Sequence, residues 1–210
     1  MLLFVPMLFA SQSALMQPPI LAQAATVLPQ LSIAGNAVPA VPFYSQFTDI
    51  SSASWKGKGC GIASLAMVIG YYKQSPVSVD DLLKQGIAAN AYESDAGWTY
   101  NGLIQVAQEH GLSGTAYDLS SSKTTAAYAQ FASALKGGPV IASIHYKFDP
   151  KSTIPHLVVI DSIQNGIVYY NDPAAKSGEK QVSVGTFLGA WKKRYIIIRP
   201  KSGSTQSTLA

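Results

Sequence analysis

The sequence predicts an α+β protein in which a helical half precedes an antiparallel sheet half. Two observations carry this prediction: apolar residues recur at helical spacing from Cys60 to Leu135, and apolar runs of strand character follow from Pro139. With 210 residues, 48% hydrophobic and 12% charged, the chain can bury one sizeable core. We therefore expect one folded domain over residues 41–200, with a cleft between its two halves.

The N-terminal segment has the pattern of an export signal. Its first residues are apolar and Ala22-Gln23-Ala24 offers a small-x-small cleavage site, so residues 1–24 are interpreted as a signal peptide, although no basic residue opens it. A membrane-spanning helix is less favoured because Pro6 interrupts the run. Residues 25–40 are interpreted as a spacer and residues 201–210 as a flexible tail. We expect a bacterial protein that is secreted or held at the cell surface, without stable membrane association beyond the signal segment.

The helical half is expected to begin after a short edge strand over Val41–Ser45, where Pro42 is tolerated. The first helix starts at Cys60, the only cysteine, and ends near Gln74. Capping patterns and apolar spacing predict three further helices, from Ser78 to Ile87, from Tyr100 to His110 and from Ala126 to Leu135.

The sheet half is expected to contain four strands and one short helix. The helix covers residues 183–191, and the strands cover residues 139–146, 157–163, 167–170 and 195–198. The net charge is +4, and the basic residues are most concentrated at Lys192-Lys193-Arg194. We interpret this cluster as a solvated helix end; the alternative is weak contact with an anionic partner such as cell-wall polymer. No base-reading motif supports binding of nucleic acid.

Cys60 is the candidate nucleophile. It lies in the first turn of a helix that is apolar on all sides and therefore central. Unpaired backbone N–H groups and the positive end of the helix dipole favour a thiolate at such a position. A cysteine so placed can act as a nucleophile, and a lone cysteine forms no intramolecular disulfide.

Three histidines could share the proton of Cys60. His110 stands at a helix C-terminus and His145 in a strand interior, so both are interpreted as structural. His156 follows Pro155 and a polar loop and begins an apolar strand, so its ring should lie at the sheet end that borders the cleft. His156 is therefore the predicted general base and acid.

Asp161 and Asp172 are the candidates for orienting the imidazole of His156. Because side chains alternate along a strand, Asp161 points away from the face of His156. An unbulged two-residue turn at Asn165-Gly166 would also turn Asp172 to the wrong face. We therefore predict a three-residue loop or a bulge at this turn, which makes Asp172 the orienter.

The alternative for Asp172 is a plain turn aspartate before Pro173.

The predicted oxyanion donor is Gln46. Attack on an amide carbonyl creates an alkoxide that needs preset donors, and Gln46 could present its NH₂ beside the N–H of Cys60.

Five motifs in this order resemble the papain-like cysteine peptidases related to the double-glycine, bacteriocin-processing peptidases, family thirty-nine of the cysteine peptidases. They are Val41–Gln46, Gly59–Met67, Gly137–Ile141, His156–Val159 and Asn171–Pro173. The resemblance implies a papain-like fold. By position it implies the roles reached above, for Gln46, Cys60, His156 and Asp172. Two departures are Ile62, where such proteins often have Pro, and the expected lack of a transporter part.

The sequence therefore predicts an exported, monomeric cysteine peptidase that cleaves peptide or protein substrates. Neither a metal nor another cofactor is expected, because the lone cysteine and scattered histidines give no ligand spacing. Two alternatives stay open: acyl transfer or cell-wall peptide cleavage at the same site, and a non-catalytic binding module on a peptidase fold. Loops over residues 48–58, 91–98 and 147–155, with Trp55 and Trp98, are expected to border the cleft.

Overall fold

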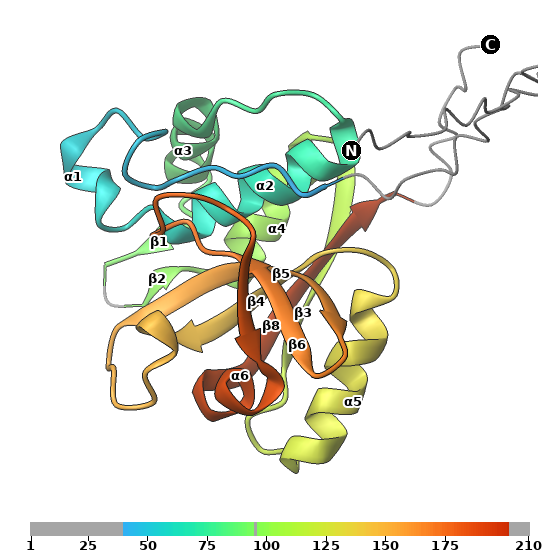
Figure 1. Cartoon of the computed structure of the whole chain (residues 1–210). Helices are drawn as coiled ribbons and strands as arrows, with labels where there is room; N and C mark the ends of the chain where they lie inside the picture. The colour runs from blue at the N-terminus through green and yellow to red at the C-terminus, as the bar shows by residue number, and fades with distance from the viewer. Residues whose placement is uncertain (1–39, 95, 202–210) are drawn as a thin grey trace, which may run out of the picture. The chain divides into compact units, whose positions relative to one another are not determined.

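The computed structural model describes residues 40–94 and 96–201 (Figure 1). The predicted signal peptide, the spacer apart from Ala40 and the tail apart from Lys201 lie outside the described residues. Within the described ranges, no helix is both long and apolar enough to cross a membrane.

The helical half is built around one buried helix. All ten residues from Gly61 to Gly70 are buried, which explains why this helix is apolar on every side. The next two long helices pack against it and begin at Ser78 and Thr99, whose hydroxyls accept N–H bonds from the first turn. The half comprises α1 (Ala53–Lys56), α2 (Cys60–Lys73), α3 (Val79–Ala88) and α4 (Tyr100–Glu109).

The sheet half is a six-stranded antiparallel sheet with the order β3-β8-β4-β5-β6-β7. Its strands are β3 (Leu112–Asp118), β4 (Val140–His145), β5 (Pro155–Gln164), β6 (Ile167–Asn171), β7 (Lys180–Ser183) and β8 (Trp191–Pro200). The remaining elements are a small hairpin of β1 (Tyr92–Glu93) and β2 (Gly97–Trp98), a 3-10 turn (Tyr146–Phe148), α5 (Thr124–Leu135) and α6 (Val184–Ala190). The predicted α+β class is confirmed.

Both faces of the central strands are covered (Figure 1). Val159 of β5 belongs to the core shared with α2, α3 and α4. Its neighbours Val158 and Ile160 pack in a second core with Phe131 of α5 and Phe187 of α6. A strand that is buried on both faces is apolar at consecutive positions, so β5 shows a continuous apolar run instead of alternation.

The peripheral strands differ from the prediction. The expected edge strand over Val41–Ser45 is wrong, because that segment pairs with no strand in the described structure. Three elements were not predicted: the edge strands β3 and β7 and the short β1–β2 hairpin. In β3 the alternation is carried by Leu112, Gly114 and Ala116, which are too small on average to give a clear apolar pattern.

The β5–β6 hairpin has a two-residue turn, so the predicted three-residue loop is wrong. Asn165 and Gly166 have φ values of 49° and 77°, and Gln164 pairs with Ile167 across the turn. Asn-Gly is the sequence that best tolerates positive φ at both central positions of such a turn.

The extra residue predicted at this turn lies within β5 instead, at Asp161. The register shifts between Ile160 and Ser162, and as a result Val159 pairs with Asn171. The bulge lies four residues before the turn. It gives the end of the hairpin that carries His156 and Asp172 the shift in register that the sequence required.

The carboxyl group of Asp161 is largely buried at the bulge. Its Oδ2 accepts a hydrogen bond from Asn171 Nδ2 at 2.8 Å, and its Oδ1 has no partner among the described residues. Burial raises the pKa of Asp161 from 3.8 to about 7, although the bond from Asn171 acts in the opposite direction. Because the folded-state pKa is the higher one, the charge destabilises the fold as pH rises through this interval.

We expect Asp161→Asn to stabilise the protein at pH 7.5, by on the order of 1–4 kcal/mol. The amide keeps an acceptor for Asn171 and removes the buried charge. The free energy of unfolding, measured by urea titration, should fall between pH 4 and pH 7 in the wild type and stay nearly level in the variant. Glu93→Gln, at an exposed site, is the control that should keep the wild-type slope; a slope that survives in Asp161→Asn contradicts the prediction.

Candidate active site

Two glycines allow the chain to pack tightly around Cys60 at the start of α2. A Cβ on Gly59 would clash with Ile50 Cδ1, and a Cβ on Gly61 would lie 2.7 Å from the side chain of Trp98. Trp98 in turn donates its Nε1–H to the carbonyl of Lys58 at 2.6 Å. The loop before Cys60 is therefore held on one side by Trp98, and the cysteine remains partly exposed.

A buried hydrogen bond joins the cysteine helix to the histidine strand. Ser64 Oγ donates to the carbonyl of Leu157 at 3.2 Å, and both residues are buried. Ser64 lies one helical turn after Cys60, and Leu157 directly follows His156. The bond thus helps to set the position of the thiol relative to the imidazole.

His156 is buried between Cys60 and Asp172, with only 4% of its surface exposed. Its Nε2 lies 2.6 Å from Asp172 Oδ1, and the ring of Tyr146 packs edge-on at 5.1 Å. His156 also hydrogen bonds with Cys60. Because Nε2 faces Asp172, Nδ1 is the nitrogen left for the sulfur.

The surroundings of His156 favour its protonated form. Burial lowers the pKa of His156, but the hydrogen bonds to Asp172 and Cys60 and the charges of these groups outweigh it and raise the pKa from 6.5 to about 9. At neutral pH the imidazolium therefore stands between a carboxylate and the sulfur. Such a cation stabilises a thiolate, the nucleophilic form of cysteine.

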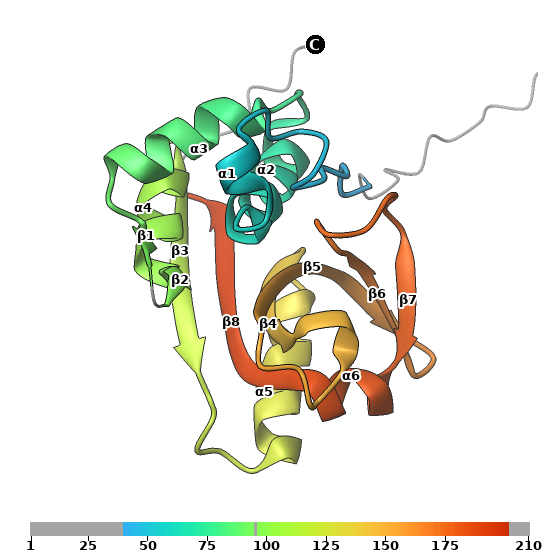
Figure 2. The ribbon, with the colours of Figure 1, turned by 90° about the vertical axis from the view of Figure 1, so that its left-hand side faces the viewer.

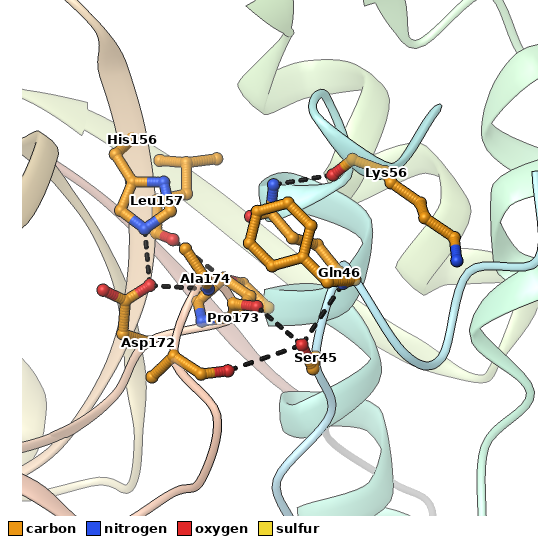
Figure 3. A network of polar contacts seen from close by, with 11 residues as sticks. Ser45, Gln46, Lys56, His156, Leu157, Asp172, Pro173 and Ala174 are labelled. Carbon is orange, nitrogen blue, oxygen red and sulfur yellow. Dashed lines mark hydrogen bonds and ion pairs between the residues drawn. The ribbon is translucent and has the colours of Figure 1, made fainter. Parts of the chain in front are cut away.

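Asp172 is held in the loop that follows β6 (Figure 3). Its Oδ1 accepts the N–H of Ala174 at 2.8 Å in addition to facing His156. The backbone N–H of Gln46 donates to the carbonyl of Pro173 at 2.8 Å, and Ser45 Oγ donates to the same carbonyl at 3.3 Å. The side chain of Asp172 thus both stabilises the turn at Pro173 and contacts the imidazole of His156.

Gln46 lies beside the residue that precedes Cys60, and its side chain is 4% exposed. Its Nε2 donates to the carbonyl of Lys56 at 2.7 Å, a bond that the sequence did not predict. Its Oε1 has no partner in the described ranges. An amide nitrogen carries two N–H groups, so one remains to donate elsewhere. The predicted oxyanion role of Gln46 stays a prediction.

A cavity of about 670 Å³ opens on Cys60 and His156. All three loops predicted to border the cleft contribute to its wall, for example through Lys58, Trp98 and Pro155. Asp172 and Gln46 do not line it; Asp172 lies behind the imidazole, as a residue acting through His156 would.

One side of this cavity was not predicted from the sequence. Residues at the end of β3 line it because β3 pairs with β8, and β3 itself was not predicted. The interpretation of Lys192-Lys193-Arg194 as a solvated helix end is wrong: α6 ends at Ala190, and the cluster lies within β8. The wall residues that were not predicted include Tyr100, Tyr117, Asp118, Ser143, Lys192 and Arg194.

The other two histidines have partners away from Cys60. His110 Nε2 lies 2.8 Å from Gln85 Oε1, and His145 Nδ1 lies 2.7 Å from the carbonyl of Ser152. Both contacts suit the structural roles predicted for these residues. Across the described ranges, no group of three or more His, Cys, Asp or Glu side chains is arranged to hold a metal ion.

The model of the Peptidase_C39 like family matches residues 38–197. No curated protein matches the chain. Among solved structures, a double glycine motif protease from an AMS/PCAT transporter, in complex with the leader peptide, is 23% identical with a TM-score of 0.53, over 79% of this chain and 96% of that one.

Two further solved structures are similar. The peptidase domain of Streptococcus ComA, a bi-functional ABC transporter involved in a quorum sensing pathway, is 19% identical with a TM-score of 0.50, over 69% of this chain and 93% of its own. A C39-like peptidase from Bacillus anthracis is 21% identical with a TM-score of 0.52, over 74% and 92%. At these identities the similarity establishes the papain-like peptidase fold. Together with a family match over most of its length, this means that the chain belongs to the Peptidase_C39 like family.

Proposed function

We propose that the protein is an exported cysteine peptidase that cleaves peptide bonds through Cys60, His156, Asp172 and Gln46. The observation that carries the proposal is the continuous contact from Asp172 through His156 to Cys60 at the wall of the cavity. A nucleophile, a base and an orienting group in this sequence of contacts form the arrangement of a thiol hydrolase.

In the first half of the reaction, the Cys60 thiolate attacks the carbonyl carbon of the substrate amide. A carbon–sulfur bond forms, and the carbonyl oxygen becomes an alkoxide. The N–H of Cys60, in the first turn of α2, and the remaining N–H of Gln46 donate to this oxygen. His156 then gives its Nδ1 proton to the departing amine, the carbon–nitrogen bond breaks, and a thioester remains.

In the second half, water cleaves the thioester. His156, now neutral, takes a proton from the water as it attacks the carbonyl carbon. The carbon–sulfur bond breaks, the acid product leaves, and the pair returns to thiolate and imidazolium. Asp172 accepts the Nε2–H bond throughout, which keeps the ring in one orientation and stabilises its charge.

Peptides are the proposed substrates. The family membership supports a cysteine peptidase type of domain, and the similar double glycine motif protease is bound to a leader peptide. Export is proposed from the signal pattern of residues 1–24. It is tested by the mass of the protein recovered from the culture medium or cell surface, which should correspond to cleavage after Ala24.

Incubation with a mixture of unstructured peptides should give products by mass spectrometry, and Cys60→Ala should give none. Acid quenching of the wild type should trap an acyl adduct on Cys60, identified by intact mass. Peptidoglycan fragments form the second arm of the experiment. Products from these fragments alone would favour the cell-wall amidase alternative, and binding without any product would favour the non-catalytic module.

A further inference from the structure

A bulge in β8 turns two cations of the basic cluster toward the cavity. Ser143 pairs with Arg194 whereas the next residue of β4, Ile144, pairs with Trp191, so Lys192 and Lys193 are extra residues on β8. Lys193 has a φ of 55° and donates its Nζ–H to the carbonyl of Ser122. Lys192 and Arg194 line the cavity instead. Figure 2 shows β8 as a long strand that bends sharply near its start.

The positive charge of this wall is only partly compensated. Arg194 Nε lies 2.9 Å from Asp118 Oδ2, and both side chains are about half exposed, at 44% and 53%. Exposed pairs of this kind are weak and exchange readily for other partners. The ammonium group of Lys192 has no hydrogen bond or ion pair with any described residue. Burial and then the charge of Arg194 lower the pKa of Lys192.

The rest of the wall adds donors and one more cation. The hydroxyls of Tyr100 and Ser143 are hydrogen-bonded to each other beside Arg194. Lys58 lines the cavity as well, with Nζ 5.7 Å from the ring centroid of Trp55. Among the described lining residues, three Lys and Arg side chains thus face one carboxylate, that of Asp118.

We propose that Lys192 and Arg194 form a subsite that binds a carboxylate of the substrate, so that the site prefers acidic peptides. The inference rests on the proposed peptidase function, because it names the peptides that the cleft takes. An incoming carboxylate relieves the repulsion between the two cations and offers the planar Arg194 side chain a matching acceptor. The carboxylate belongs either to an acidic side chain or to the C-terminus of the peptide.

Paired peptides test the proposal and separate the two sources. The pairs are identical except for Glu or Gln at one position, scanned along the peptide, and each is made with a free or an amidated C-terminus. With wild-type protein, kcat/KM should be about three- to tenfold higher for the acidic member at one position or for the free C-terminus. The preference should shrink as ionic strength rises.

Variants locate the preference on the wall. Lys192→Gln and Arg194→Gln should each reduce it toward equality, and Lys192→Arg should restore it. Lys193→Gln is the matched control, because it removes the same charge from the same bulge but outside the cavity; it should keep the preference. A preference that survives both Lys192→Gln and Arg194→Gln overturns the proposal, provided that urea unfolding shows both variants folded.

A binding measurement separates failure of this inference from failure of the proposed function. Cys60→Ala protein is titrated with the same peptide pairs, and the two Kd values are compared by calorimetry. If the wild type cleaves no peptide while Cys60→Ala still binds the acidic member three- to tenfold more tightly, the peptidase proposal fails and the subsite stands. Equal Kd values across all pairs overturn the subsite whatever the catalytic result.

Discussion

We expect iodoacetamide to alkylate Cys60 at pH 6.5 about ten- to a hundredfold faster than it alkylates an ordinary exposed cysteine. An ordinary thiol is about 1% ionised at this pH, and only the thiolate reacts. The physical reason is the protonated His156, which Asp172 holds and which hydrogen bonds with Cys60; a cation beside a cysteine favours the thiolate form. The measurement is the rate of adduct formation by intact mass, with Cys60→Ala as the unreactive reference.

His156→Ala should bring this rate down to that of an ordinary cysteine. Asp172→Asn keeps the shape of the side chain but removes the charge that favours the imidazolium, so an intermediate rate is expected. His145→Ala is the matched control: it removes a histidine from the neighbouring strand, whose ring faces Ser152 and not Cys60. An unchanged rate in His156→Ala would contradict the activated pair.

Gln46→Ala should lower kcat for peptide hydrolysis by about 10²–10³-fold while leaving the alkylation rate of Cys60 near that of the wild type. Hydrolysis passes through an alkoxide that needs the amide donor. Alkylation is a direct displacement by sulfur and creates no such oxygen. The two reactions of the same thiolate therefore respond differently if Gln46 serves the oxyanion.

The bond from Gln46 to the carbonyl of Lys56 makes the comparison decisive. If Gln46 acts only by holding the loop before Cys60, its loss should change alkylation and hydrolysis together. Gln164→Ala, which removes an exposed amide at the far end of β5, should change neither. Equal losses in both reactions of Gln46→Ala, or no loss in hydrolysis, would contradict the oxyanion role.

The longer helices and the central strands β4, β5, β6 and β8 could be predicted because their signals are local. Ser78 and Ser183 cap helices at the expected residues, and the buried α2 is apolar on every side. The edge strands gave weaker signals, since β3 and β7 have few large apolar residues. The strand expected at Val41–Ser45 is absent: the segment pairs with no described strand, and its last residue, Ser45, contacts the carbonyl of Pro173 through its side chain.

The candidate site was predicted as a set of residues together with three bordering loops, and the side of its wall formed by β3 and β8 was not predicted. Side-chain parity alone required one extra residue between His156 and Asp172, and that requirement is met. Parity cannot say where the extra residue lies, because a bulge at any point of the hairpin shifts the strand end equally. Asn165-Gly166 forms a two-residue turn, so the extra residue has to lie within a strand. The structure places it at Asp161.

By itself, the sequence determined the α+β class, the family and the residues Cys60, His156, Asp172 and Gln46 as candidates, because periodicity, capping and motif order are written along the chain. Only the tertiary structure decided which side chains meet. It placed Asp172 behind His156 through a bulge at Asp161, and it turned Lys192 and Arg194 into the cavity through a second bulge in β8. Both depend on pairing between strands distant in sequence, which no local pattern encodes.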